Sequence, residues 1–484
     1  MSGFLSVGLR ALPLLLLFQA VGCRAAHTVA TTERPTSKAV VPSEAVSEET
    51  APPAPEDDEV AESETASRIQ MTSLVDSTTE SERSEVIDAP LIDQDELQLD
   101  WLVAEVLRRN PNRQAAIAAW QAAAQRYPQA VALDDPLLQT MISPSGLASD
   151  QVNGAYMVGV AQKVPWSGKR ELRGTQSQWE QTATQWDARD TDLRLTEAAK
   201  LAYFEYYLTA RRLEVNAESG LAVREYRDTA RSKYETGQVT QQDVLQTDVE
   251  LAQLARRHIE LEREQHIAVA RINTLLHRLP TTALPPPPQS LEIDGELPPS
   301  EVLSVWAVES RPDLLAMSAR IQSERASIEL ARKEFYPDFE FMARYDAFWQ
   351  EQPLRPMVGM NMNVPINQRR RHAAVNEAIF RLNKMCAEYT AEADNVRNDV
   401  QAAYERLTAS RQIVELYDST ILQAAEANVA AANAEYTAGT VDFLRLVAAQ
   451  REVIELREQR FEAVAEYHVR KAELERLVGR PAVN

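Results

Sequence analysis

The longest helical pattern in the chain runs from Lys169 to Tyr234 without a proline, directly after the sequence Pro165-Trp166-Ser167-Gly168. At 1.5 Å of rise per residue, a helix of this length is a rod of roughly 100 Å. Helices of ordinary globular domains are only a few turns long. The run therefore indicates a coiled coil, a membrane-linked bundle or a repeat.

A second run, Arg369 to Tyr436, has neither proline nor glycine, begins after Val364-Pro365 and ends in the same Tyr-x-x-Gly pattern. The landmarks of the two runs are separated by nearly constant distances in the sequence. Pro165 and Pro365 are 200 residues apart, and Gly237 and Gly439 are 202 residues apart. The chain is therefore interpreted as two tandem copies of one unit.

Each copy begins with a helical segment, expected over 97–132 in the first copy and over 300–335 in the second. Tyr127 and Tyr336 are each followed by a proline, and the residue before a proline is displaced from the α conformation. These two tyrosines are therefore predicted to mark the change from helix to strand. We expect the junctions between strands and helices at five positions: Pro128, Pro165, Gly168, Pro337 and Pro365.

Apolar and polar residues alternate in the segments that follow, which is the pattern of a half-buried strand. The clearest alternation runs from Asp338 to Phe348 and from Met357 to Val364; Tyr156 to Val164 is similar, and Leu137 to Ser143 is weaker. About ten residues with one apolar face also suffice for a strand of a transmembrane barrel. A soluble hairpin would show the same pattern.

Four strands cannot close a membrane barrel, and open sheet edges in lipid would leave backbone groups unpaired. If the strands cross a membrane, several chains must share one barrel. Three copies would give twelve strands, and two copies would just reach the minimum of about eight known for bacterial single-chain barrels. Strand counting alone therefore leaves the dimer and the trimer open.

The N-terminal part has a different character. Residues 1–23 contain Arg10 and a short apolar run, which is typical of an export signal. This signal ends in Ala20-Val21-Gly22-Cys23, which resembles a lipoprotein processing site with lipidation of Cys23; ordinary signal cleavage is the alternative. Residues 24–95 hold 17 Asp and Glu against 5 Lys and Arg and no aromatic residue. This composition predicts a disordered acidic tether.

The remaining chain divides into a first repeat at 96–280, a proline-rich linker at 281–298 and a second repeat at 299–480. A formal net charge of −21 without a basic patch gives no support to nucleic-acid binding. The six histidines are scattered, and no catalytic, phosphate-binding or metal-binding spacing occurs. We therefore expect no enzyme, no cofactor and no metal site.

The order of helix, two strands, very long helix, tight turn and shorter helix, duplicated behind an export signal, resembles the TolC family of bacterial outer-membrane efflux proteins. The resemblance covers Leu97 to Arg480, and its local motifs are Ser310-Arg311-Pro312-Asp313-Leu314, Ala331 to Pro337, Tyr234-x-x-Gly237 with Asp243, and Tyr436-x-x-Gly439-Thr440. The implied fold is mainly α with a small β part. The implied assembly is a homotrimer with a twelve-stranded barrel in outer-membrane lipid and an α-helical tunnel in the periplasm.

The resemblance also implies a function. The tunnel would pass small molecules, drugs or metal ions outward in a tripartite efflux system, or proteins in a type I secretion system, with a periplasmic adaptor and an inner-membrane pump as partners. The alternative from another class is a lipid-tethered periplasmic coiled-coil protein of structural or interaction function, without a channel.

Carried over to this sequence, the resemblance places the periplasmic gate at the hairpin tips around Gly237 and Gly439. Tyr436 and Asp243 match the pair that holds the family's tunnel closed. The family's latch arginine corresponds to Val441, and an acidic constriction position corresponds to Arg445. A ring of Arg445 would favour anions; pairing of Arg445 with a neighbouring acid is an equally open interpretation.

Overall fold

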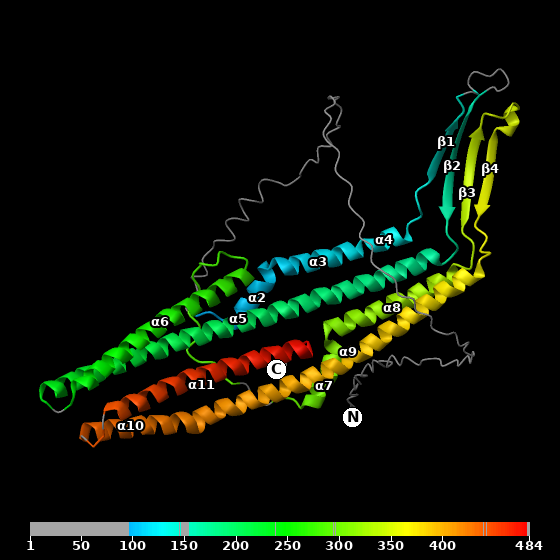
Figure 1. Cartoon of the computed structure of the whole chain (residues 1–484). Helices are drawn as coiled ribbons and strands as arrows, with labels where there is room; N and C mark the ends of the chain where they lie inside the picture. The colour runs from blue at the N-terminus through cyan, green and yellow to red at the C-terminus, as the bar shows by residue number, and fades with distance from the viewer. Residues whose placement is uncertain are drawn as a thin grey trace, which may run out of the picture. The chain divides into compact units, whose positions relative to one another are not determined.

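The computed structural model describes residues 96–144, 146, 154–237, 239–293, 295, 297–438, 440–441 and 443–481. Within these residues the chain is mainly helical and contains one four-stranded sheet (Figure 1). The predicted fold class, mainly α with a small β part in a duplicated unit, is confirmed for this part of the chain. The predicted export signal, acidic tether and lipidated Cys23 lie outside the described residues.

The first half opens with three consecutive helices, α2 (Leu99–Arg109), α3 (Pro111–Ala124) and α4 (Arg126–Val131). The Asn110 side chain caps α3 by accepting a hydrogen bond from the Asn112 N–H at 2.9 Å. The prediction that Pro128 ends the helix is wrong. Pro128 lies in the first turn of α4, where a missing N–H is tolerated, and the helix continues to Val131.

The second half opens with α7 (Ser300–Ser310) and α8 (Pro312–Lys333). Pro312 occupies the first turn of α8, the position that favours proline in a helix. The helix ends before Tyr336, and Pro337 leads into a strand. The predicted change from helix to extended chain at Tyr336 is therefore confirmed in this half.

The sheet consists of β1 (Leu137–Ile142), β2 (Tyr156–Val164), β3 (Phe339–Asp346) and β4 (Pro356–Met362), with a short 3-10 turn at Gln352–Leu354. All neighbours are antiparallel, in the order β1-β2-β3-β4. The central pair joins the two halves of the chain, because β2 belongs to the first half and β3 to the second. Within the described residues, β1 and β4 each keep one open edge.

One face of the sheet is apolar and exposed. The register places Leu138, Val160, Ala343 and Val358 in a row across the four strands. Leu138 is 68% exposed and Val358 is 89% exposed. The predicted alternation is therefore confirmed, and its apolar face is uncovered in the single chain.

Each half continues into a long helical hairpin. In the first half, α5 (Lys169–Glu235) is followed by α6 (Gln241–Leu275). The second half has α9 (Gln368–Leu416), a π turn (Tyr417–Ile421), α10 (Leu422–Ala438) and α11 (Phe443–Val478). Helix α5 packs along α6, α8 and α11, so it contacts both halves of the chain.

Two apolar cores stabilise these helices. Leu102, Phe204 and Ile272 belong to the first core, which joins α2, α5 and α6. The second core joins α7, α9 and α11, and it also includes Tyr207 of α5, which is 1% exposed. The long helix of the first half therefore contributes a buried aromatic side chain to the core of the second half.

Gly174 allows α4 to lie close against α5. A Cβ atom at this position would come within 2.6 Å of Val131 Cγ1 and 3.0 Å of Tyr127 Cε2. The absence of a side chain at Gly174 therefore sets the distance between the two helices.

Among the described helices, none combines the length and the apolar composition needed to cross a membrane. In the described ranges, no group of three or more His, Cys, Asp or Glu side chains could hold a metal ion.

Candidate gate at the hairpin tips and the strand-to-helix junctions

The tip of the first hairpin is a tight turn between α5 and α6. Gly237 has a φ angle of +74°, which a residue without a side chain adopts at low cost, and its N–H donates to the Tyr234 carbonyl at 2.9 Å. Thr240 precedes α6, and the Asp243 carboxylate accepts a hydrogen bond from the Thr240 N–H at 3.1 Å. Asp243 therefore stabilises the start of α6 as a capping residue.

Tyr436 lies near the end of α10 in a small apolar cluster at the second tip. It is 5% exposed and packs with Leu446 and Val447 of α11, and Tyr226 and Val441 pack against the same cluster. Tyr226 comes from α5, so this cluster joins the two hairpins of the chain. The second tip glycine, Gly439, lies outside the described residues.

Lys233, in the last turn of α5, contacts Tyr436 in two ways. Its Nζ atom lies 3.9 Å from the centroid of the Tyr436 ring, which is the geometry of a cation–π interaction. The same ammonium group donates a hydrogen bond to the Tyr436 carbonyl oxygen at 3.2 Å. One cation therefore connects the ends of α5 and α10.

The pKa of the Tyr436 phenol depends on burial and on the charge of Asp243 at the first hairpin tip. Burial raises its pKa, and the negative charge of Asp243 raises the pKa further. The two predicted gate residues thus influence each other electrostatically. At neutral pH the phenol keeps its proton and can donate a hydrogen bond.

The two positions that depart from the family pattern have different surroundings. Val441 is half-buried, and its apolar side chain packs against the Tyr436 cluster. Arg445 lies in the first turn of α11 and is exposed. Lys233, from the other hairpin, places a cation beside Tyr436.

Two ion pairs connect the return helices α6 and α11 above the tips. Glu250, 5% exposed, accepts a hydrogen bond from Arg451 Nε at 2.7 Å. One heptad further along, Arg257 Nη2 lies 3.3 Å from Glu458 Oε2. The two pairs have opposite polarity, because α6 contributes the acid to the first pair and the base to the second.

At the opposite end of α5, Gly168 adopts a φ angle of +84° and is followed by Lys169, which is fully buried. The Lys169 ammonium lies 2.9 Å from Asp338 Oδ1 and 3.3 Å from Glu334 Oε1. Asp338 also accepts a hydrogen bond from the Trp166 N–H at 2.9 Å. A buried cation thus connects the start of α5 to the start of β3.

Asp338 remains ionised in this environment. Partial burial raises its pKa, but the hydrogen bonds from Lys169 and Trp166, with the Lys169 charge, bring the net pKa below its usual value. The carboxylate is therefore the partner that makes burial of the Lys169 ammonium tolerable.

The predicted proline junctions lie at or near the observed ends of strands, except for Pro128, which lies in α4 as described above. Pro165 directly follows β2, Pro337 lies just before β3, and Pro365 lies between β4 and α9. Beside the junctions at Pro165 and Pro337, the Trp166 ring stacks on the Tyr336 ring, with the ring centroids 5.2 Å apart. Aromatic stacking thus fixes the two junctions against each other.

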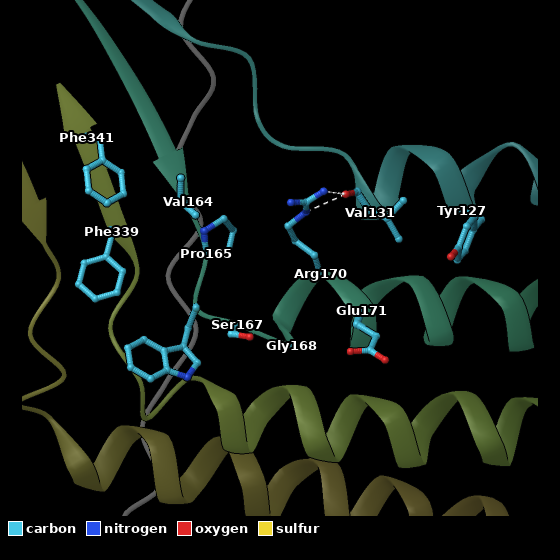
Figure 2. Close-up of a pocket in the computed structure, with 11 residues that line it drawn as sticks. Tyr127, Val131, Val164, Pro165, Ser167, Gly168, Arg170, Glu171, Phe339 and Phe341 are labelled. Atoms are coloured by element: carbon cyan, nitrogen blue, oxygen red, sulfur yellow. Dashed lines mark hydrogen bonds between the residues drawn. The ribbon is translucent and has the colours of Figure 1, made fainter. Parts of the chain in front are cut away.

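A groove of about 710 Å³ opens beside these junctions (Figure 2). Its walls are mainly apolar and come from α4, β2, β3 and the segment that connects β2 to α5; they include Tyr127, Val131, Val164, Phe339 and Phe341. Arg170 and Glu171 lie at its helical end, and Arg170 Nε donates to the Val131 carbonyl at 2.7 Å.

Sequence reasoning missed Lys233, Glu250 and the Lys169–Asp338 pair. A lysine directly after a glycine that begins a long helix was the signal available for Lys169. Lys233 and Glu250 carry no comparable signal, since charged residues are frequent on both helices and their partners lie about 200 residues away.

The fold matches those of solved outer-membrane proteins. It superimposes with a TM-score of 0.67 on the outer membrane protein VceC from Vibrio cholerae, at 16% identity, over 79% of this chain and 96% of that one. The open state of the Neisseria gonorrhoeae MtrE outer membrane channel matches with a TM-score of 0.66 and 16% identity, over 80% of this chain and 89% of that one. The described residues thus have the fold of outer-membrane channel proteins.

Sequence comparison supports the same family. Residues 303–480 match the model of the outer membrane efflux protein family, which confirms the resemblance to TolC-like efflux proteins for this part of the chain. This is a family of channels rather than enzymes. The cobalt-zinc-cadmium resistance protein CzcC of Cupriavidus metallidurans is 23% identical over 201 residues, 40% of this chain and 47% of CzcC. The match therefore spans about half the length of this curated relative.

Proposed function

We propose that the chain is the outer-membrane channel of a tripartite efflux system and functions as a homotrimer. The observation that carries the proposal is the four-stranded sheet, which has two open edges and one exposed apolar face. Open edges leave N–H and C=O groups without partners, which lipid does not tolerate. Pairing of β4 with β1 of a second copy satisfies both edges, and three copies close a barrel of twelve strands.

In this proposal the apolar face of the sheet meets outer-membrane lipid, and the long hairpins extend into the periplasm. The hairpin tips form the gate that an adaptor and an inner-membrane pump open. Tyr436, Asp243 and Lys233 hold the closed state, and Arg445 lines the narrow part of the channel. Cys23 carries a lipid anchor, which mass spectrometry of the mature N-terminus can test.

The cargo is a small molecule, a drug or a metal ion. The similarity to a cobalt-zinc-cadmium resistance protein supports divalent metal cations as the first cargo to test. Deletion of the chain in its own host should then lower resistance to zinc, cobalt or cadmium ions. Unchanged resistance to these ions would redirect the search to organic compounds.

The shared sheet can be tested with cysteines at the two edges. Gln139→Cys on β1 and Asn361→Cys on β4 are introduced into a variant without the native cysteines, and a short bis-maleimide linker is added in detergent. We expect a covalent ladder that ends at three chains. Gln139→Cys alone is the matched control and should give monomers. A double variant that stays monomeric, or a ladder that ends at two chains, contradicts the proposed trimer.

A further inference from the structure

We propose that the groove beside the strand-to-helix junctions binds one phospholipid with a zwitterionic head group that ends in a primary ammonium. This inference rests on the proposed function, because it requires the apolar face of the sheet to meet lipid. It adds a specific binding site to that general contact.

The first observation is continuity between the groove and the apolar face of the sheet. Phe339 and Phe341 of β3 and Val164 of β2 line the groove. The register pairs Val164 with Phe339, and Phe341 with Gln162 two positions away on β2, so Val164, Phe339 and Phe341 share one face of the sheet. An acyl chain lying on this face can therefore continue into the groove along Phe341 and Phe339, with Gln162 as the polar neighbour of Phe341 on β2.

The second observation is the apolar volume. The groove holds about 710 Å³ and is walled by Tyr127, Val131, Pro165 and the three residues of the sheet. Binding sites for small molecules fall in the range of about 300 to 1,000 Å³. Phe341 is 51% exposed and Tyr127 is 38% exposed in the single chain, so large apolar surfaces are available to a ligand.

The third observation is the pair of opposite charges at the helical end. Arg170 directs Nε and one terminal nitrogen to the Val131 carbonyl, which leaves the other terminal nitrogen to meet a phosphate. Glu171, the next residue, is exposed and also lines the groove. Figure 2 shows these two side chains leaving the first turn of α5 in different directions, with the guanidinium toward Val131. A phosphate beside Arg170 and an ammonium beside Glu171 would then correspond to the two ends of a zwitterionic head group.

The charges of Arg170 and Glu171 also favour one class of phospholipid head group over the others. An anionic head group without an amine, such as that of phosphatidylglycerol, would pair with Arg170 but bring no cation to Glu171. A quaternary ammonium carries the positive charge but has no N–H to donate to the carboxylate. A primary ammonium satisfies both requirements, which is the reason for the choice of head group.

Native mass spectrometry of the full-length protein in detergent can test the site. The protein is incubated separately with palmitoyl-oleoyl phosphatidylethanolamine, phosphatidylglycerol and phosphatidylcholine. We expect about one phosphatidylethanolamine per protomer to remain at collision energies that remove the other two lipids. Equal retention of all three lipids, or preferred retention of phosphatidylglycerol, overturns the proposal.

Three variants locate the lipid. Val131→Trp fills the groove and Arg170→Leu removes the phosphate partner, and each should reduce retained phosphatidylethanolamine at least fivefold. Glu171→Gln is a mild change at an exposed position and should abolish the preference for phosphatidylethanolamine over phosphatidylcholine. Arg173→Leu, one turn along α5 and outside the groove lining, is the matched control and should behave like the parent.

The same spectra report the mass of the assembly, so two kinds of failure remain distinct. A trimer that retains lipid equally in the parent and in all variants overturns the groove site and leaves the channel proposal intact. A protein that is monomeric and needs no detergent overturns the channel proposal itself. If Val131→Trp or Arg170→Leu prevents assembly, the outcome for Glu171→Gln decides the groove site.

Discussion

Lys233 lies over the aromatic ring of Tyr436 and donates a hydrogen bond to the Tyr436 carbonyl oxygen, with Nζ 3.9 Å from the ring centroid and 3.2 Å from that oxygen. The two residues belong to different halves of the chain. A single side chain therefore holds the end of the first long helix against the end of the second. In the proposed channel this contact favours the closed tip.

Lys233→Met should raise single-channel conductance in planar bilayers. The substitution keeps an unbranched side chain of similar length but removes the cation, so it removes a cation–π interaction of about 0.5 to 2 kcal/mol per protomer. Lys233→Arg is the matched control, because a guanidinium can still stack on the ring. A Lys233→Met channel with the conductance of the parent would show that the contact does not bias the gate.

Tyr436→Phe combined with Asp243→Ala should also raise conductance. The first change removes the phenol, and the second removes both the charge that acts on that phenol and the cap of α6. Asp243→Asn keeps a capping oxygen and separates the two effects of Asp243. If the double variant conducts like the parent, this pair does not form the gate.

Arg445→Asp should change ion selectivity more than conductance. An exposed ring of positive charge at a narrow pore favours anions, and a ring of carboxylates favours cations. The reversal potential in a salt gradient across a planar bilayer measures this directly. A reversal potential that stays the same in Arg445→Asp would place Arg445 away from the narrow part of the channel.

Asp338→Asn should destabilise the protein in a manner that depends on pH. Removal of the carboxylate leaves the fully buried Lys169 with a weaker partner. Breaking a buried ion pair in this way costs about 3 kcal/mol. The folded-state pKa of Asp338 lies below its unfolded value, so its contribution is complete above an unfolded pKa of about 3.9. The contribution is lost as the pH falls through the lower folded value.

Thermal unfolding of the parent and of Asp338→Asn at neutral pH and near pH 3 tests this sign. The difference between the two melting temperatures should be largest at neutral pH and should shrink in acid. A difference in melting temperature that grows in acid contradicts a lowered pKa of Asp338 in the folded protein.

Gly174→Ala should destabilise the first half although alanine is the better helix former. The intrinsic gain of about 1 kcal/mol is opposed by contacts of 2.6 Å to Val131 and 3.0 Å to Tyr127. Gly220→Ala is the matched control, because nothing lies within 4 Å of its added Cβ atom. We expect Gly220→Ala to raise the melting temperature and Gly174→Ala to lower it.

The repeat, the long helices and the alternating strands could be predicted from the sequence because each follows from local pattern. Pro165 and Pro365 mark equivalent junctions, and Phe341 alternates with polar neighbours on its strand. Pro128 was misinterpreted because a proline is equally compatible with the first turn of a new helix. Nothing local in the sequence distinguishes these two cases.

The contacts of the candidate site were harder to predict for a different reason. Lys233 with Tyr436 and Glu250 with Arg451 depend on which faces of two distant helices meet. Charged residues occur on every exposed face of these helices, so composition does not select the pairs. The duplication indicated that the hairpins are neighbours, but it did not fix their rotation.

The π turn at Tyr417–Ile421 accounts for one of the two residues by which the two halves differ in length between the junction proline and the tip glycine. From Pro165 to Gly237 the chain advances 72 residues, and from Pro365 to Gly439 it advances 74. A π turn accommodates an additional residue within one turn, so the helix beyond it keeps its apolar side toward α11. There, Tyr417 donates a hydrogen bond to Gln459 at 3.0 Å. A long helical hairpin of this kind can thus hold one additional residue at a π turn without losing the phase of its coiled coil.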